Sequence, residues 1–182
     1  MNISFGTEGW RAVIGDKFTF DNVRKFAHAV ANWLYWPKRG NLDIYANGFV
    51  RGAKLKCASP NKGVAIGYDT RFMSDKFASV AADEFAACGI PVFLSSSFTV
   101  APIISDYVLN NNLAAGIIIT ASHNTPEYNG IKYKGEYGGS AVPEIIWGIE
   151  KMFETKIDYI PSDCRRCTVS LFYLRSSMWK IS

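Results

Sequence analysis

The chain has 182 residues, of which 48% are hydrophobic and 20% charged, and it carries a formal net charge of +4. This length and composition suit one globular domain with a buried core. Most of the excess positive charge follows residue 160, so the main body has no basic stripe and we expect no nucleic-acid partner. We find no membrane-length apolar run and no signal-peptide pattern, and therefore expect a cytoplasmic protein with no membrane partner.

The first third of the chain predicts one helix between two irregular segments. Residues 6–11 include Gly6 and Gly9, whose permissive backbone angles favour a tight loop. Thr19 is a suitable N-cap for a helix, and apolar residues then recur at helical spacing until Pro37. These apolar residues are Val23, Phe26, Ala27, Val30 and Leu34. Residues 37–61 predict an irregular connection.

Strand and helix patterns alternate through the rest of the main body, which indicates a layered α/β fold. Short apolar runs predict strands at 64–68, 91–94, 114–120 and 131–134. Segments with one apolar face predict helices at 77–88, at 102–109 and from Pro143 to Phe153. No period persists after residue 160. We therefore predict a domain at residues 1–158 followed by an irregular tail at residues 159–182.

The segment whose residue types best suit a functional site follows the clearest predicted strand, at residues 114–120. Ligands bind outside the carboxyl ends of strands in open α/β sheets, so Ser122 is expected to be exposed there. His123 can donate a hydrogen bond to a phosphate, and Lys132 comes near if the loop folds back as a hairpin. Arg11 offers a planar fork for phosphate oxygens. Each feature alone has an ordinary interpretation as a solvated turn or surface charge.

Together, the motifs resemble those of the phosphoglucomutase/phosphomannomutase family of phosphohexomutases. They appear in that family's order and span about residues 3–155. The segments that carry the resemblance are Phe5-Gly6-Thr7-Glu8-Gly9-Trp10-Arg11, Gly67-Tyr68-Asp69-Thr70-Arg71, Thr120-Ala121-Ser122-His123-Asn124, Asn129-Gly130-Ile131-Lys132 and Tyr137-Gly138-Gly139-Ser140-Ala141. The resemblance implies the first domain of such an enzyme, a three-layer α/β/α sandwich with a small mixed sheet.

The resemblance also implies roles for individual residues. Ser122 is phosphorylated, passes its phosphoryl group to a hexose phosphate, and supplies one ligand to Mg²⁺. His123, Lys132 and Arg11 are implied to polarise the phosphate and assist proton transfer. Hexose 1,6-bisphosphate is the implied activator. The implied phosphate-binding positions are Thr7, Gly9, Thr120, Asn124 and Arg71. For Arg71 we favour support of the serine loop over contact with substrate.

The sequence departs from the family pattern in two respects. Thr125 stands where the family usually has a proline, and Pro126 follows it. The aspartate cluster Asp-x-Asp-x-Asp, which holds the metal in the family, does not occur in this sequence. The rival hypothesis is therefore a folded chain that is inactive by itself. We expect such a chain to self-associate weakly through the surface that would meet the next domain.

The cysteines permit one further interpretation. We expect Cys57, Cys88, Cys164 and Cys167 to be reduced thiols. Cys88 lies at the end of an apolar helical face and is expected in the core. A zinc module on Cys164 and Cys167 is disfavoured, because this pair supplies two ligands where structural zinc takes four.

Overall fold

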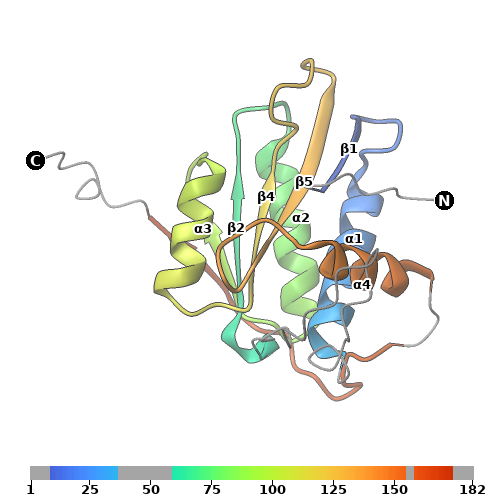
Figure 1. Cartoon of the computed structure of the whole chain (residues 1–182), viewed down its shortest axis with the longest axis vertical. Helices are drawn as coiled ribbons and strands as arrows, with labels where there is room; N and C mark the ends of the chain where they lie inside the picture. Colours follow the sequence, from blue (N-terminus) through green and yellow to red (C-terminus); the bar gives the residue numbers. More distant parts are fainter. Residues whose placement is uncertain (1–8, 37–58, 155–157, 174–182) are drawn as a thin grey trace, which may run out of the picture.

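The computed structural model describes residues 9–36, 59–154 and 158–173. Within these residues a mixed sheet has the strand order β1-β5-β4-β2-β3-β6, with helices on both sides (Figure 1). The strands are β1 (Trp10–Val13), β2 (Val64–Tyr68), β3 (Val92–Ser95), β4 (Ala115–Ile119), β5 (Tyr128–Gly135) and β6 (Val169–Phe172). The helices are α1 (Phe20–Tyr35), the short 3-10 helix η2 (Pro60–Lys62), α2 (Ser74–Ala87), α3 (Ala101–Asn110) and α4 (Pro143–Glu154).

The sheet has a parallel part and an antiparallel part. Strands β4, β2, β3 and β6 run parallel to one another, whereas β5 is antiparallel to both β4 and β1. All of β4 is buried, as its continuous apolar sequence predicts. Because β2 and β4 are parallel neighbours, their carboxyl ends meet at one edge of the sheet, where the candidate site lies.

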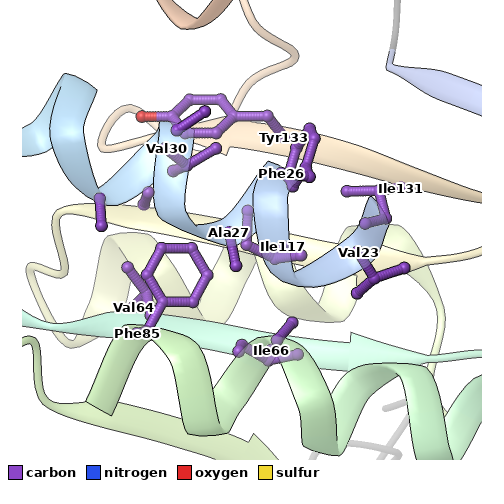
Figure 2. Packing of buried hydrophobic residues seen from close by; sticks show 14 of the residues in the cluster. Val23, Phe26, Ala27, Val30, Val64, Ile66, Phe85, Ile117, Ile131 and Tyr133 are labelled. Atoms are coloured by element: carbon purple, nitrogen blue, oxygen red, sulfur yellow. The ribbon is translucent and has the colours of Figure 1, made fainter. Parts of the chain in front are cut away.

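The two faces of the sheet are covered by different helices. The larger apolar cluster joins one face to α1, α2 and α4, and Figure 2 shows the apolar side of α1 packed over the sheet beside α2. The smaller cluster joins the other face to α3 through Ile104 and Val108. Each fully buried Val, Ile or Phe side chain contributes about 1.5–3 kcal/mol to stability. The three-layer α/β/α prediction is confirmed.

The predicted helix boundaries agree closely with the structure. Helix α1 begins after Thr19, whose hydroxyl oxygen accepts a hydrogen bond from the Asn22 amide at 3.3 Å. Gly89, with a φ of 73°, follows the end of α2 as the expected stop. Pro143 is the first residue of α4. Most of the predicted irregular connection, residues 37–58, lies outside the described residues.

Two predictions about the ends of the domain are wrong. Trp10 and Arg11 belong to strand β1 rather than to a tight loop, since Trp10 and Ala12 alternate into the core. Strand β6 lies within the predicted irregular tail and pairs with β3. Its only buried residue is Phe172, which stacks on Tyr107 with ring centroids 4.1 Å apart. An edge strand held mainly by backbone hydrogen bonds has no hydrophobic period for sequence analysis to detect.

Among the described residues, no helix combines the length and the apolar character that crossing a membrane requires.

Candidate functional site: the Ser122 loop

The site is built at the carboxyl ends of β2 and β4. The turn at residues 69–73 follows β2, and the loop at residues 121–127 connects β4 to β5. The two segments start side by side, because the Asp69 amide donates a hydrogen bond to the Ile119 carbonyl at 3.0 Å. The loop after β4 folds back as a hairpin, which is the condition for Lys132 to come near Ser122, since β4 and β5 are antiparallel neighbours.

Ser122 is exposed and has an unusual backbone conformation. Its φ of 59° lies in the left-handed region, which costs a residue with a side chain about 1–2 kcal/mol. The Ser122 amide donates to the Thr120 hydroxyl oxygen at 3.0 Å, so Thr120 helps to hold this conformation. Strained residues of this kind concentrate at functional sites, where the surrounding structure holds them in place.

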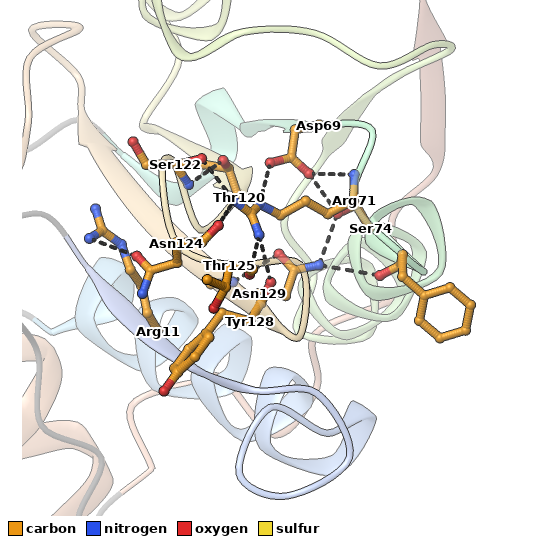
Figure 3. Close-up of polar contacts among 12 residues, drawn as sticks. Arg11, Asp69, Arg71, Ser74, Thr120, Ser122, Asn124, Thr125, Tyr128 and Asn129 are labelled. Atoms are coloured by element: carbon orange, nitrogen blue, oxygen red, sulfur yellow. Dashed lines mark hydrogen bonds and ion pairs between the residues drawn. The ribbon is translucent and has the colours of Figure 1, made fainter.

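The main brace of the loop is Arg71. Its Nη2 donates to the carbonyls of Ser122 and Asn124 at 2.8 and 2.6 Å, and its Nη1 donates to those of Thr125 and Tyr128 at 2.9 and 3.1 Å (Figure 3). Its Nε faces the Asp69 carboxylate at 3.4 Å. A guanidinium has five N–H donors. All five are therefore directed at the protein itself, which favours support of the loop over phosphate contact.

A partly buried polar network lies behind Arg71 and fixes Asp69 and the start of α2. Asp69 accepts hydrogen bonds from the Ser74 hydroxyl at 2.8 Å and from the Arg71 amide at 3.0 Å. The side-chain amide of Asn129 donates to Ser74 at 2.9 Å, and its oxygen accepts from the Gly130 amide at 2.8 Å. No role of Asp69, Ser74 or Asn129 is predicted by the sequence. Asp69 and Asn129 stood within the recognised motifs, but nothing in the sequence marked Ser74.

Two basic side chains share one face of the sheet beside this loop. Trp10 pairs with Ile131, and both belong to the core under α1. Because side chains alternate along a strand, Arg11 and Lys132 lie on the opposite face, which α3 covers only in part. Gly130 stands opposite Arg11, and Lys132 is two residues further along β5. Diagonal neighbours of this kind are close enough for long side chains to meet.

Of the remaining predicted site residues, three are placed by the structure and one is not. Arg11 Nη1 donates to the Asn124 side-chain oxygen at 3.4 Å, and His123 is exposed beside Ser122. Gly9 has a φ of 134°, and a Cβ there would lie 2.0 Å from the Ile131 carbonyl oxygen, so only glycine fits. Thr7 lies outside the described residues.

Thr125, the departure from the family pattern, has a structural use in the loop. Its hydroxyl donates to Glu127 Oε1 at 2.6 Å, and this hydrogen bond holds the pKa of the Glu127 carboxyl below its ordinary value. Its carbonyl accepts from both Arg71 and the Tyr128 amide. The loop therefore keeps a closed turn at this position.

The strain at Ser122 predicts a characteristic order of variant stabilities. We expect Ser122→Gly to be more stable than Ser122→Ala by about 1 kcal/mol, because glycine adopts a positive φ without steric cost. Urea unfolding of both variants measures the difference. The matched pair is Ser79→Gly and Ser79→Ala on the exposed side of α2, where alanine should be the more stable by about 1 kcal/mol. The same order at both positions would contradict a strained Ser122.

The fold and site together define a class: an α/β/α domain that presents a braced serine loop at the carboxyl edge of its sheet. The family model "Phosphoglucomutase/phosphomannomutase, alpha/beta/alpha domain I" matches residues 41–159. The chain belongs to the phosphoglucomutase/phosphomannomutase family and contains its domain I.

Individual relatives agree with this assignment. A phosphoglucomutase of Staphylococcus saprophyticus is 34% identical over 145 residues, which cover 78% of this chain and 22% of that protein. A crystal structure of a putative phosphomannomutase from Thermus thermophilus is 31% identical, with a TM-score of 0.68 over 94% of this chain and 33% of that one. A family member from Burkholderia thailandensis, 21% identical with a TM-score of 0.58 over 94% of this chain and 33% of that one, shares the fold. The chain spans about a fifth of the length of the curated relatives it matches.

Proposed function

We propose that Ser122 carries a phosphoryl group and exchanges it with a hexose phosphate, as part of an isomerase of the phosphoglucomutase/phosphomannomutase type. The observation that carries the proposal is the conformation of Ser122, exposed at a φ of 59° while Arg71 holds the carbonyls on both sides of His123. The names of the relatives supply the substrate class.

The proposed step is a phosphoryl transfer between two hydroxyl oxygens. Ser122 Oγ attacks a phosphorus of a hexose 1,6-bisphosphate, an O–P bond to serine forms, and the O–P bond to the sugar breaks. The serine proton leaves and the sugar oxygen gains one, so the step is balanced. The reverse transfer gives the phosphoryl group to a hexose phosphate. Such reactions depend mainly on positioning and on compensation of charge on the phosphoryl oxygens.

The basic residues around the loop can compensate the negative charge on the phosphoryl oxygens. We propose that Arg11 and Lys132 bind the phosphoryl oxygens from the sheet face, and that His123 donates a hydrogen bond or accepts the serine proton. Thr120 and Asn124 shape the pocket for the phosphate, and Gly9 brings the backbone of β1 close to it. Arg71 is a positioning residue in this scheme, because its donors are already bound to the loop.

The residues that the structure describes around Ser122 do not by themselves make a Mg²⁺ site. Magnesium takes about six oxygen ligands in octahedral geometry, and Ser122 offers one. Of the two carboxylates within these segments, Asp69 is held by Arg71 and Ser74, and Glu127 by Thr125. We propose no step through the metal. This donor set favours the second hypothesis, in which the chain folds but has no mutase turnover by itself.

We expect incubation of the chain with glucose 1,6-bisphosphate to phosphorylate Ser122, which mass spectrometry of the digested protein can map. Ser122→Ala should abolish the label, and Ser140→Ala, at another exposed serine, should leave it unchanged. Label on a different serine, or none on Ser122, would contradict the exchange. A coupled assay for glucose 6-phosphate separates the two hypotheses, because label without turnover identifies a chain that is inactive by itself.

A further inference from the structure

A second group of reactive side chains lies where α1 and α2 pack together. His28 comes from α1, whereas Glu84 and Cys88 are four residues apart on one side of α2 and its C-cap. His28 Nδ1 lies 3.0 Å from Glu84 Oε1 and 3.8 Å from Cys88 Sγ, and that sulfur lies 3.7 Å from the same Glu84 oxygen. One nitrogen, one oxygen and one sulfur therefore face a common point.

These separations match those of ligands around tetrahedral zinc. Bond lengths of about 2.0–2.1 Å to nitrogen, 2.0–2.2 Å to oxygen and 2.3 Å to sulfur place neighbouring ligands roughly 3.3–3.6 Å apart. Each observed distance lies within a few tenths of an ångström of that range. Imidazole, thiolate and carboxylate are all ligands that zinc accepts.

Charged side chains that contact the far side of these ligands also favour metal binding. The other ring nitrogen of His28, Nε2, faces the Asp158 carboxylate at 3.6 Å, as metal-bound histidines commonly do. The second oxygen of Glu84 faces Arg24 Nε at 3.9 Å. Both ligands are therefore oriented by a charged group beyond them. Cys88 is only 4% exposed, which limits its access to oxidants.

We propose that His28, Glu84 and Cys88 bind a zinc ion, with a fourth position open to the adjoining pocket. That pocket has a volume of about 310 Å³ and is lined by His28, Glu84, Arg24, Lys25 and three apolar residues. Three protein ligands with one open position is the arrangement of zinc sites that bind water or a small ligand. Arg24 and Lys25 favour an anion as that ligand.

In the metal-free protein these groups hold protons that zinc must displace. Burial and the Glu84 carboxylate raise the pKa of Cys88 to about 12. The hydrogen bond to Glu84 raises the pKa of His28, with Asp158 adding to the effect. Zinc replaces the Cys88 thiol proton and the His28 Nδ1 proton, and both His28 and Glu84 then coordinate the metal in place of their hydrogen bond to each other.

This site is separate from the Ser122 loop. Ser74, at the start of α2, belongs to the loop's polar network, whereas Glu84 lies ten residues later in the same helix, about 15 Å along its axis. The zinc proposal therefore does not depend on the proposed phosphoryl transfer.

The test uses the full chain, reduced and stripped with a chelator, and titrates it with Co²⁺ and Zn²⁺. We expect one bound Co²⁺ with a thiolate-to-cobalt absorption band that Zn²⁺ removes by displacement. Cys88→Ala should eliminate the band, and Glu84→Gln should weaken zinc binding. Cys167→Ser is the matched control and should leave both unchanged. Circular dichroism checks that each variant is folded.

Asp158→Asn provides a second variant at an exposed position, where the asparagine oxygen can still accept the hydrogen bond that the Ile160 amide donates to Asp158 Oδ1 at 3.0 Å. It should weaken zinc binding by about tenfold or more, because it removes only the carboxylate behind His28. The proposal is overturned if no thiolate band forms. It is equally overturned if the band persists in Cys88→Ala, or if Cys167→Ser removes it, which would identify a site on Cys164 and Cys167 instead.

Discussion

Replacing Arg71 by lysine should lower the free energy of unfolding by about 2–3 kcal/mol, since hydrogen bonds to charged groups contribute about 1.5–3 kcal/mol. Arg71 connects the turn after β2 to four carbonyls of the Ser122 loop. An ammonium keeps the charge, but it is a compact group that cannot reproduce the planar fork. We expect Ser122 phosphorylation to slow by about a hundredfold, the cost of a displacement of about 1 Å at a reacting group.

Urea unfolding measures the first effect and the rate of labelling by glucose 1,6-bisphosphate measures the second. Hydrogen exchange adds a direct view of the loop, because the Asn124 and Tyr128 amides are bonded within it and should lose protection in Arg71→Lys. Arg11→Ala is the contrasting variant, since Arg11 makes one long hydrogen bond to Asn124. It should slow labelling while leaving loop exchange and stability nearly unchanged. Equal effects of both variants on exchange would disprove a special positioning role for Arg71.

Most of the fold could be predicted because its elements are both regular and buried. The continuous apolar run of β4 indicates a strand buried on both faces, and the helical spacing of Val23, Phe26 and Val30 indicates one packed side of α1. Strand β1 was missed because a four-residue strand between glycine-containing segments offers only one alternation, Trp10 and Ala12. Strand β6 was missed because its stability depends on pairing with β3, a partner far away in sequence.

The candidate site was predictable only where the type of a residue, or its place in a motif, indicates its chemical role. Ser122 stood out as a polar residue after an apolar strand, and Arg71 as a motif residue with a supporting role. The roles of Ser74 and Asn129 depend on contacts between residues 55 apart, which no local pattern encodes. The same limit explains the zinc proposal. Cys88 was expected to be a core residue, and its burial confirms this, but its proximity to His28 across 60 residues appears only in the folded chain.

At Gly130 the backbones of the neighbouring strands leave no room for a side chain. A Cβ there would lie 2.7 Å from the Thr120 carbonyl oxygen, 2.8 Å from the Trp10 carbonyl oxygen and 2.9 Å from Arg11 Cγ. Two of these three atoms are backbone atoms, one on each side of β5. Relief would therefore require β1 or the end of β4 to move away from β5 and lengthen the hydrogen bonds between them, such as that from the Thr120 amide to the Gly130 carbonyl at 2.8 Å.

We therefore expect Gly130→Ala to lower the free energy of unfolding by about 3 kcal/mol, at the upper end of the usual cost of overpacking. Urea unfolding measures the loss. Gly139→Ala is the matched control, because the Cβ at that position meets only the ring of Tyr137, which is 42% exposed and can move. Its stability should stay within about 1 kcal/mol of the parent chain.

The same substitution should also affect the site, because Gly130 lies between Arg11 on β1 and Thr120 at the end of β4. A shift of β1 would move Arg11 relative to Ser122 and slow phosphorylation. A Gly130→Ala chain with unchanged stability and labelling would show that the strands yield without cost, and that the close packing around Gly130 does not position the site.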